Sequence, residues 1–108
     1  MSPEELGKRL TELRKALSRD SAEDWTQPRL GKELGLTQNA IHRLEHGNGS
    51  IVNLSLLVDF YHIKGYNIQW VMALDNSKLR MYRADKAPDQ ELLQALENLN
   101  KIINNKFS

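Results

Sequence analysis

The N-terminal part of the chain carries leucines at the spacing of an amphipathic helix. They recur at intervals of four, three and four residues: Leu6, Leu10, Leu13 and Leu17. This spacing places the leucines on one face, and charged residues occupy the other faces. With Ser2 as N-cap and Pro3 in the first helical position, the pattern predicts a helix over residues 3–18. The polar stretch 18–25 breaks the period and predicts a loop.

Two short helices are predicted next, each with a capping residue at its start and a glycine at its end. Thr26 caps the first, which ends at Gly35, and Thr37 caps the second, which ends at Gly47. The inward-facing residues are Leu30 and Leu34 in the first helix, and Ile41 and Leu44 in the second.

The helical pattern then continues to about residue 75. One further helix is indicated by a run of apolar residues ending near Gly65: Leu54, Leu57, Val58 and Tyr61. Asn67 caps a last short helix, which contains Ile68, Val71 and Met72. Five helices over residues 1–75 predict an all-α domain.

Residues 76–108 are predicted to form a C-terminal extension with elements of its own. Apolar and polar residues alternate over residues 78–83, which predicts a short strand. From Pro88 onward a helix is predicted by a second apolar stripe: Leu92, Leu96, Leu99 and Ile103. Two interpretations of this extension stay open, because it could pair two copies of the chain or fold back onto its own domain.

Composition excludes several classes of protein. A chain of 108 residues is too short for a large multi-domain enzyme, and the lack of cysteine excludes a disulfide framework and thiolate metal sites. No apolar run approaches the roughly 18 residues of a membrane span, so we expect a soluble, cytoplasmic protein with no membrane partner. The net charge of +1 excludes a polybasic coat but not a small basic face assembled in three dimensions.

The two helices flanking the Gly35–Thr37 turn have the layout of a helix-turn-helix, whose second helix enters the DNA major groove. The segment TQPRLGKELGLTQNAIHRLEHG closely resembles the helix-turn-helix of the Cro and phage-repressor family, also called the xenobiotic-response-element family. The residues that carry the resemblance are Thr26, Gln27, Leu30, Gly31, Gly35, Thr37, Gln38, Ile41, Leu44, Glu45 and Gly47. It extends to Leu10, Leu13 and Arg14 in the first helix and to residues 67–72, and so covers roughly residues 5–75.

The resemblance implies a five-helix, lambda-repressor-like domain, and two departures from the family pattern stand out. The segment between Arg14 and Gln27 is longer than usual, and the stretch 63–65 is also extended. Residues 76–108 have no family counterpart. None of these departures touches the second helix of the motif.

Roles for individual residues follow from the resemblance and from their chemistry. Base contacts are expected from four residues: Gln38, Asn39, His42 and Arg43. Amides can pair with adenine and Arg with guanine; the alternative is a merely solvated helix face. Contacts to the DNA backbone are expected from Gln27, Asn48, Ser50 and Asn53, with a plain turn as the alternative for the last three. Arg14 and Glu45 resemble the family's internal ion pair, a structural role.

Catalysis and metal binding find no support in the sequence. His42 and His46 lie four residues apart, but no third ligand or zinc-protease spacing accompanies them. No paired carboxylates, phosphate loop or nucleophile with a base are present, so we expect neither an enzyme nor a bound cofactor or metal.

The sequence therefore predicts a sequence-specific regulator of transcription that binds double-stranded DNA, most simply a repressor located at the nucleoid. A homodimer on a pseudo-palindromic operator is expected, because one recognition helix supplies too little specificity alone. The alternative is an antitoxin, which would bind a toxin as its partner and repress their shared operon.

Overall fold

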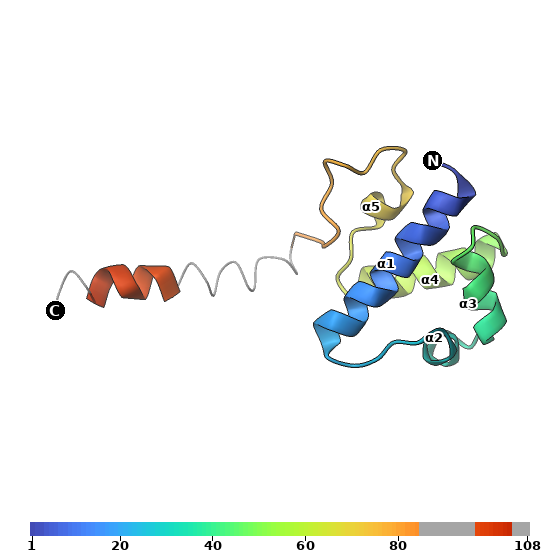
Figure 1. The fold of residues 1–108 in the computed structure, drawn as a ribbon, viewed down its shortest axis with the longest axis horizontal. Coiled ribbons are helices and arrows are strands. Elements are labelled where there is room, and N and C mark those ends of the chain that lie inside the picture. Colours follow the sequence, from blue (N-terminus) through green and yellow to red (C-terminus); the bar gives the residue numbers. More distant parts are fainter. Residues whose placement is uncertain (85–96, 105–108) are drawn as a thin grey trace.

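Five short helices make up the body of the protein, and each begins at a side chain that caps its first turn. The computed structural model describes residues 1–84 and 97–104 (Figure 1). The helices are α1 (Pro3–Ser21), α2 (Gln27–Leu34), α3 (Gln38–Leu44), α4 (Ile51–Ile63) and α5 (Ile68–Met72). The capping oxygens belong to Ser2, Thr26, Thr37, Ser50 and Asn67. The predicted all-α fold and four of the predicted caps are confirmed, while the Ser50 cap is an addition.

The core lies where the sequence pattern places the apolar residues. It is built from α1 residues Leu10, Leu13, Ala16 and Leu17, with Trp25, Leu30, Ile41, Leu44, Leu57, Phe60, Tyr61, Tyr66 and Val71 from the rest of the domain. Ridges of side chains from all five helices therefore meet in one cluster, and burial of this apolar surface is the main force that stabilises the fold.

Helix α1 is longer than the sequence pattern indicates. The loop predicted from residue 18 begins only after Ser21, because two serines fit the helix by bonding backwards: Ser18 Oγ donates to Arg14 O at 3.2 Å, and Ser21 Oγ donates to Leu17 O at 2.6 Å. Ala22 then ends the helix in the left-handed conformation. The extra turn carries Asp20 to a position where it accepts a hydrogen bond from Tyr66, in the connection between α4 and α5.

The connection from α1 to α2 is anchored by Trp25. Its ring is buried against Phe60, with the ring centroids 5.5 Å apart, and its backbone N–H donates to Ser18 Oγ at 2.8 Å. The guanidinium of Arg29 covers the ring at 4.0 Å. A loop that is polar in sequence is thus fastened to the core by its one large apolar residue.

The strand predicted over residues 78–83 is not observed in the part of the chain that the structure describes. A single antiparallel bridge joins Tyr82 to Tyr66, supported by the Asn67 N–H donating to Met81 O at 2.7 Å and the Arg83 N–H donating to Gly65 O at 2.9 Å. The pairing stops there because α5 begins at Ile68, so the partner segment is extended over too few residues for a ladder.

Contacts reach well past residue 75 in this segment. The Tyr66 hydroxyl donates to Asp20 Oδ2 at 2.7 Å, and the Tyr66 and Tyr82 rings lie 5.3 Å apart. Residues up to Arg83 therefore pack on the helical domain.

Part of the predicted C-terminal helix lies within the described residues. Residues 97–104 are helical and lie outside the five-helix domain (Figure 1), with Leu99, Ile102 and Ile103 exposed to solvent. Leu92 and Leu96, which the sequence assigns to the same stripe, lie outside the described residues. Within residues 1–84 and 97–104, no helix combines the length and the apolar composition that crossing a bilayer requires.

Candidate nucleic-acid interface

Helices α2 and α3 pack closely through a turn that depends on two glycines. Gly35 ends α2 with a φ of 70°, a left-handed conformation that glycine adopts without strain. Gly31 lies where the backbone of the turn passes, and a β-carbon there would be 2.7 Å from Leu36 O. Thr37 then starts α3 by accepting the Ala40 N–H. This local chemistry sets the position of α3 relative to α2.

Helix α3 presents one polar face to solvent. Ile41 and Leu44 are buried in the core, whereas four residues are exposed: Gln38, Asn39, His42 and Arg43. At about 100° per residue they span an arc of about 140° on the side away from Ile41. Within the described residues, the side chains of Gln38, Asn39 and Arg43 make no hydrogen bond or ion pair to the protein. The structure therefore brings together the four residues expected to contact bases.

The two histidines of this region face each other rather than a third ligand. The rings of His42 and His46 lie 4.1 Å apart, and His46 Nδ1 is 2.8 Å from the carbonyl oxygen of His42. A carbonyl only accepts, so this contact assigns the proton to Nδ1 of His46. Across residues 1–84 and 97–104, no cluster of three or more metal-binding side chains is found.

A buried ion pair fastens α3 to α1. Arg14 Nε donates to Glu45 Oε2 at 2.8 Å, and Arg14 Nη2 donates to Glu45 Oε1 at 3.0 Å. Glu45 is only 7% exposed, directly after the last residue of α3. The hydrogen bonds to the Glu45 carboxylate raise the pKa of the Arg14 guanidinium above its ordinary value. The arrangement fixes the end of α3 and the direction of its polar face.

Gln27 takes part in the same cluster, which the sequence did not indicate. Gln27 is the first residue of α2, and its side-chain amide donates to Glu45 Oε1 at a distance of 3.0 Å. Glu45 thus links α1, α2 and α3. This bond uses one of the two amide hydrogens, so the predicted phosphate contact of Gln27 would come from the other hydrogen or from its backbone N–H.

The turn after α3 holds the remaining predicted backbone contacts. Asn48 and Ser50 are exposed, and Asn53 is partly buried. Ser50 Oγ accepts the Asn53 N–H at 3.1 Å as the cap of α4, so one of the donors at this helix start is already used within the protein. The Asn48 side chain and the Ser50 hydroxyl hydrogen are the groups best placed to donate outward.

Basic residues around this face are few and not all are available. Arg29 is held by Trp25 and by an exposed ion pair with Glu23 at 3.1 Å, whereas Lys32 and Arg43 extend into solvent. The surface is therefore polar with a small excess of positive charge rather than strongly basic.

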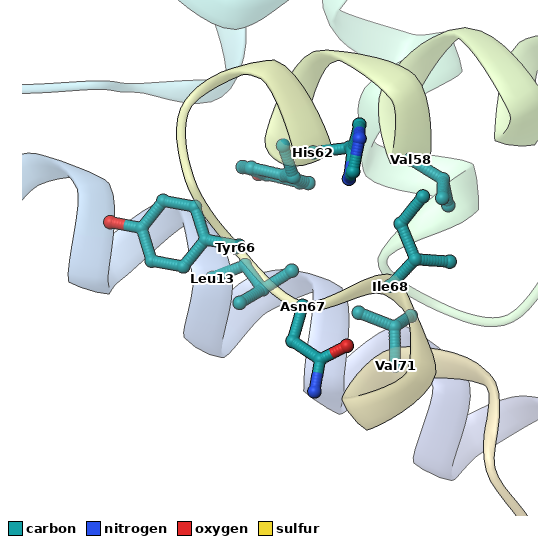
Figure 2. A pocket seen from close by; sticks show the side chains of 8 residues that line it. Leu13, Val58, His62, Tyr66, Asn67, Ile68 and Val71 are labelled. Carbon is teal, nitrogen blue, oxygen red and sulfur yellow. The ribbon is translucent and has the colours of Figure 1, made fainter. Parts of the chain in front are cut away.

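A shallow hollow of about 310 Å³, open in part to solvent, lies beside the end of α3 and is lined by Leu6, Leu44, Asn48 and Ser50 among others. The pocket in Figure 2 lies between α1, the end of α4 and α5, and its walls include Leu13, Val58, Tyr66 and Val71. Its empty volume, which includes open solvent, is about 150 Å³.

No protein-family model, no curated protein and no solved structure matches this chain. The geometry of α2 and α3 and the chemistry of the exposed side chains are thus the basis for assigning a function.

Proposed function

We propose that this protein is a sequence-specific DNA-binding regulator of transcription, a repressor that acts as a homodimer on a pseudo-palindromic operator in the manner of the Cro and phage-repressor family. The single observation that supports it best is the exposed face of α3, where Gln38, Asn39, His42 and Arg43 stand together on a helix whose end is anchored by Glu45.

The dimensions of α3 suit this role. A helix of seven residues is about 10 Å long and enters a major groove that is about 12 Å wide. Asn39 and Gln38 can each pair with adenine, and Arg43 can pair with the O6 and N7 of guanine. A side chain that is free of protein partners keeps all its donors for such contacts, because no internal bond has to be broken first.

The anchoring of α3 through Glu45 also suits the recognition of bases. Discrimination requires that donors are held in one geometry, and the Arg14–Glu45–Gln27 cluster restrains the helix from two sides. The same cluster brings the start of α2 beside α3, so a phosphate bound at Gln27 would set the register of α3 on the duplex.

Selection of bound sequences from random DNA, followed by gel-shift titration, tests the proposal. We expect a palindromic site whose half-sites are about 34 Å apart, the spacing of two recognition helices in a dimer. Arg43→Ala should relax the selected sequence at one position, whereas Arg80→Ala removes the same charge outside α3 and should leave selection unchanged. Enrichment of no sequence above background would overturn the proposal.

A further inference from the structure

Helix α4 is apolar on its outer face as well as on its buried face. Leu57, Phe60 and Tyr61 are in the core, yet Val52, Leu56 and Ile63 lie on the opposite side. Val52 and Ile63 are each 68% exposed. A helix that is apolar all round is normally covered on both sides. The α4 face formed by Val52, Leu56 and Ile63 is therefore an uncovered surface rather than an ordinary solvent-exposed helix side.

The chain carries a second uncovered apolar surface of similar size. The helix of residues 97–104 shows Leu99, Ile102 and Ile103 on one side, and Ile102 is 61% exposed. The helix of residues 97–104 lies away from α4 of its own chain (Figure 1). Eight residues of helix extend about 12 Å and the α4 face extends about 16 Å, so the tail stripe formed by Leu99, Ile102 and Ile103 is long enough to cover most of the α4 face.

We infer that the tail stripe of one copy packs on the α4 face of a second copy, so that each copy covers the other. The two-fold symmetry of such an exchange buries the same contact twice. Each contact joins six apolar side chains, which at an order of magnitude of 100 Å² each gives about 1,200 Å² for the pair of contacts. This is the lower end of the range for specific dimers.

The choice of a second copy over the tail's own chain rests on the homodimer of the proposed function. A tail folded back on its own α4 buries the contact once and leaves no surface to join two copies. When two copies exchange their tails, the contact between tail stripe and α4 face is buried twice. The exchange also forms the dimer that recognition of two half-sites requires.

The polar residues around the two surfaces fit the same pairing. Asp59 lies among the apolar residues of the α4 face and is exposed in the single chain. A carboxylate brought into an apolar interface needs donors. Asn100 borders the tail stripe on helix 97–104, and its side-chain amide can donate to this carboxylate.

Disulfide cross-linking tests the inference without competing native thiols, because the chain has no cysteine. A tagged Leu56→Cys chain is mixed with an untagged Ile102→Cys chain at full length under mild oxidation. We expect the mixed disulfide dimer as the main product. Ile102→Cys chains joined only to each other would overturn it in favour of a tail-to-tail dimer. A double Cys variant closing mainly within one chain would overturn it in favour of a folded-back tail, and no cross-link at all would also overturn it.

Sedimentation equilibrium of unmodified chains provides the quantitative measurement. Leu56→Gln and Ile102→Gln should each weaken the dimer at least about tenfold. Lys101→Gln introduces the same group on the opposite side of the tail helix and should have no effect. Unchanged dimerisation in both test variants would contradict the inference. Circular dichroism should show both to be folded, since the two side chains are exposed in one chain.

The outcome for DNA binding is separate. A chain that selects an operator but fails to cross-link retains the proposed function and loses this interface. A chain that cross-links but selects no sequence retains the interface and loses the proposed function.

Discussion

Arg14 and Glu45 form a two-pronged ion pair across 31 positions of sequence, with nitrogen–oxygen distances of 2.8 and 3.0 Å. Glu45 is nearly inaccessible, while Arg14 keeps part of its surface in solvent. The pair joins the middle of α1 to the end of α3, and its environment makes it far more sensitive to mutation than the surface pair between Arg29 and Glu23.

The first prediction concerns the stability that this pair provides. Glu45→Ala should lower the free energy of unfolding by about 2–4 kcal/mol, because it leaves the Arg14 charge partly buried without its partner. Urea unfolding followed by circular dichroism measures it. Glu23→Ala is the matched control on an exposed pair and should change stability by less than about 1 kcal/mol. Equal losses in the two variants would contradict this account.

A second prediction follows from two tyrosines in different surroundings. The Tyr61 hydroxyl is buried and has no hydrogen-bond partner among the described residues, whereas the Tyr66 hydroxyl donates to Asp20. Tyr61→Phe should therefore be neutral or stabilise by about 1 kcal/mol, and Tyr66→Phe should destabilise by about 1 kcal/mol. Thermal melting of the two variants side by side gives the signs. A larger loss in Tyr61→Phe would show that its hydroxyl has a partner.

The same tyrosines predict how stability depends on alkaline pH. Burial raises the pKa of Tyr61 and, together with its bond to Asp20, the pKa of Tyr66. The unfolded chain then loses these protons first, at about pH 10, while the folded chain still holds them. The contribution is fully present below about pH 10 and is lost as pH rises towards the folded pKa values.

Urea midpoints measured between about pH 8 and pH 11 test this dependence. The midpoint should fall steeply above about pH 10, and the fall should be less steep in Tyr61→Phe and Tyr66→Phe. A midpoint that stays constant through this range would contradict the shifts.

Local features of the sequence predict much of this fold. Caps such as Thr26 and Thr37 act on the next three residues, and the leucine spacing of α1 is set by helix geometry alone. Other features of the fold were not predictable from local sequence, because they depend on contacts between residues far apart in the chain. The course of residues 81–83 depends on their pairing with residues 65–67, where Tyr66 is in turn held by its hydrogen bond to Asp20, 46 positions away.

The candidate site likewise has features that the sequence predicts and features that only the structure shows. The exposure of Gln38, Asn39, His42 and Arg43 follows from the burial of Ile41 and Leu44 on a helix, so spacing alone predicts it. The bond from Gln27 to Glu45 was not predictable from spacing, because a surface glutamine at a helix start has the same pattern whether or not an acceptor lies beside it. The apolar residues on the outer face of α4 were visible in the sequence, but only the structure shows which of them are uncovered.

The Gln27–Glu45 bond leads to a fourth prediction, on affinity and specificity. Gln27→Ala should weaken binding to all DNA sequences by a similar factor, because it removes a backbone contact and loosens the cluster at Glu45. Arg43→Ala should instead lose about 1–3 kcal/mol of discrimination at one base pair. Titration of the selected site and its single-base variants separates the two effects. A loss confined to one base pair in Gln27→Ala would assign that residue to base reading.

The last prediction concerns salt. Affinity for DNA falls with salt in proportion to the number of phosphates that Lys and Arg neutralise. On the α2–α3 side Lys32 and Arg43 extend into solvent, whereas Arg29 is held by Trp25 and Glu23 and must give up those contacts to bind a phosphate. Contacts through amides and hydroxyls such as those of Asn48 and Ser50 release few counterions.

We therefore expect the affinity for DNA to depend on salt concentration less steeply than that of a binder with about 6–10 phosphate contacts. Fluorescence anisotropy between about 50 and 200 mM salt measures the slope. A steep slope that Lys32→Gln leaves unchanged would show that cations elsewhere in the chain face the duplex.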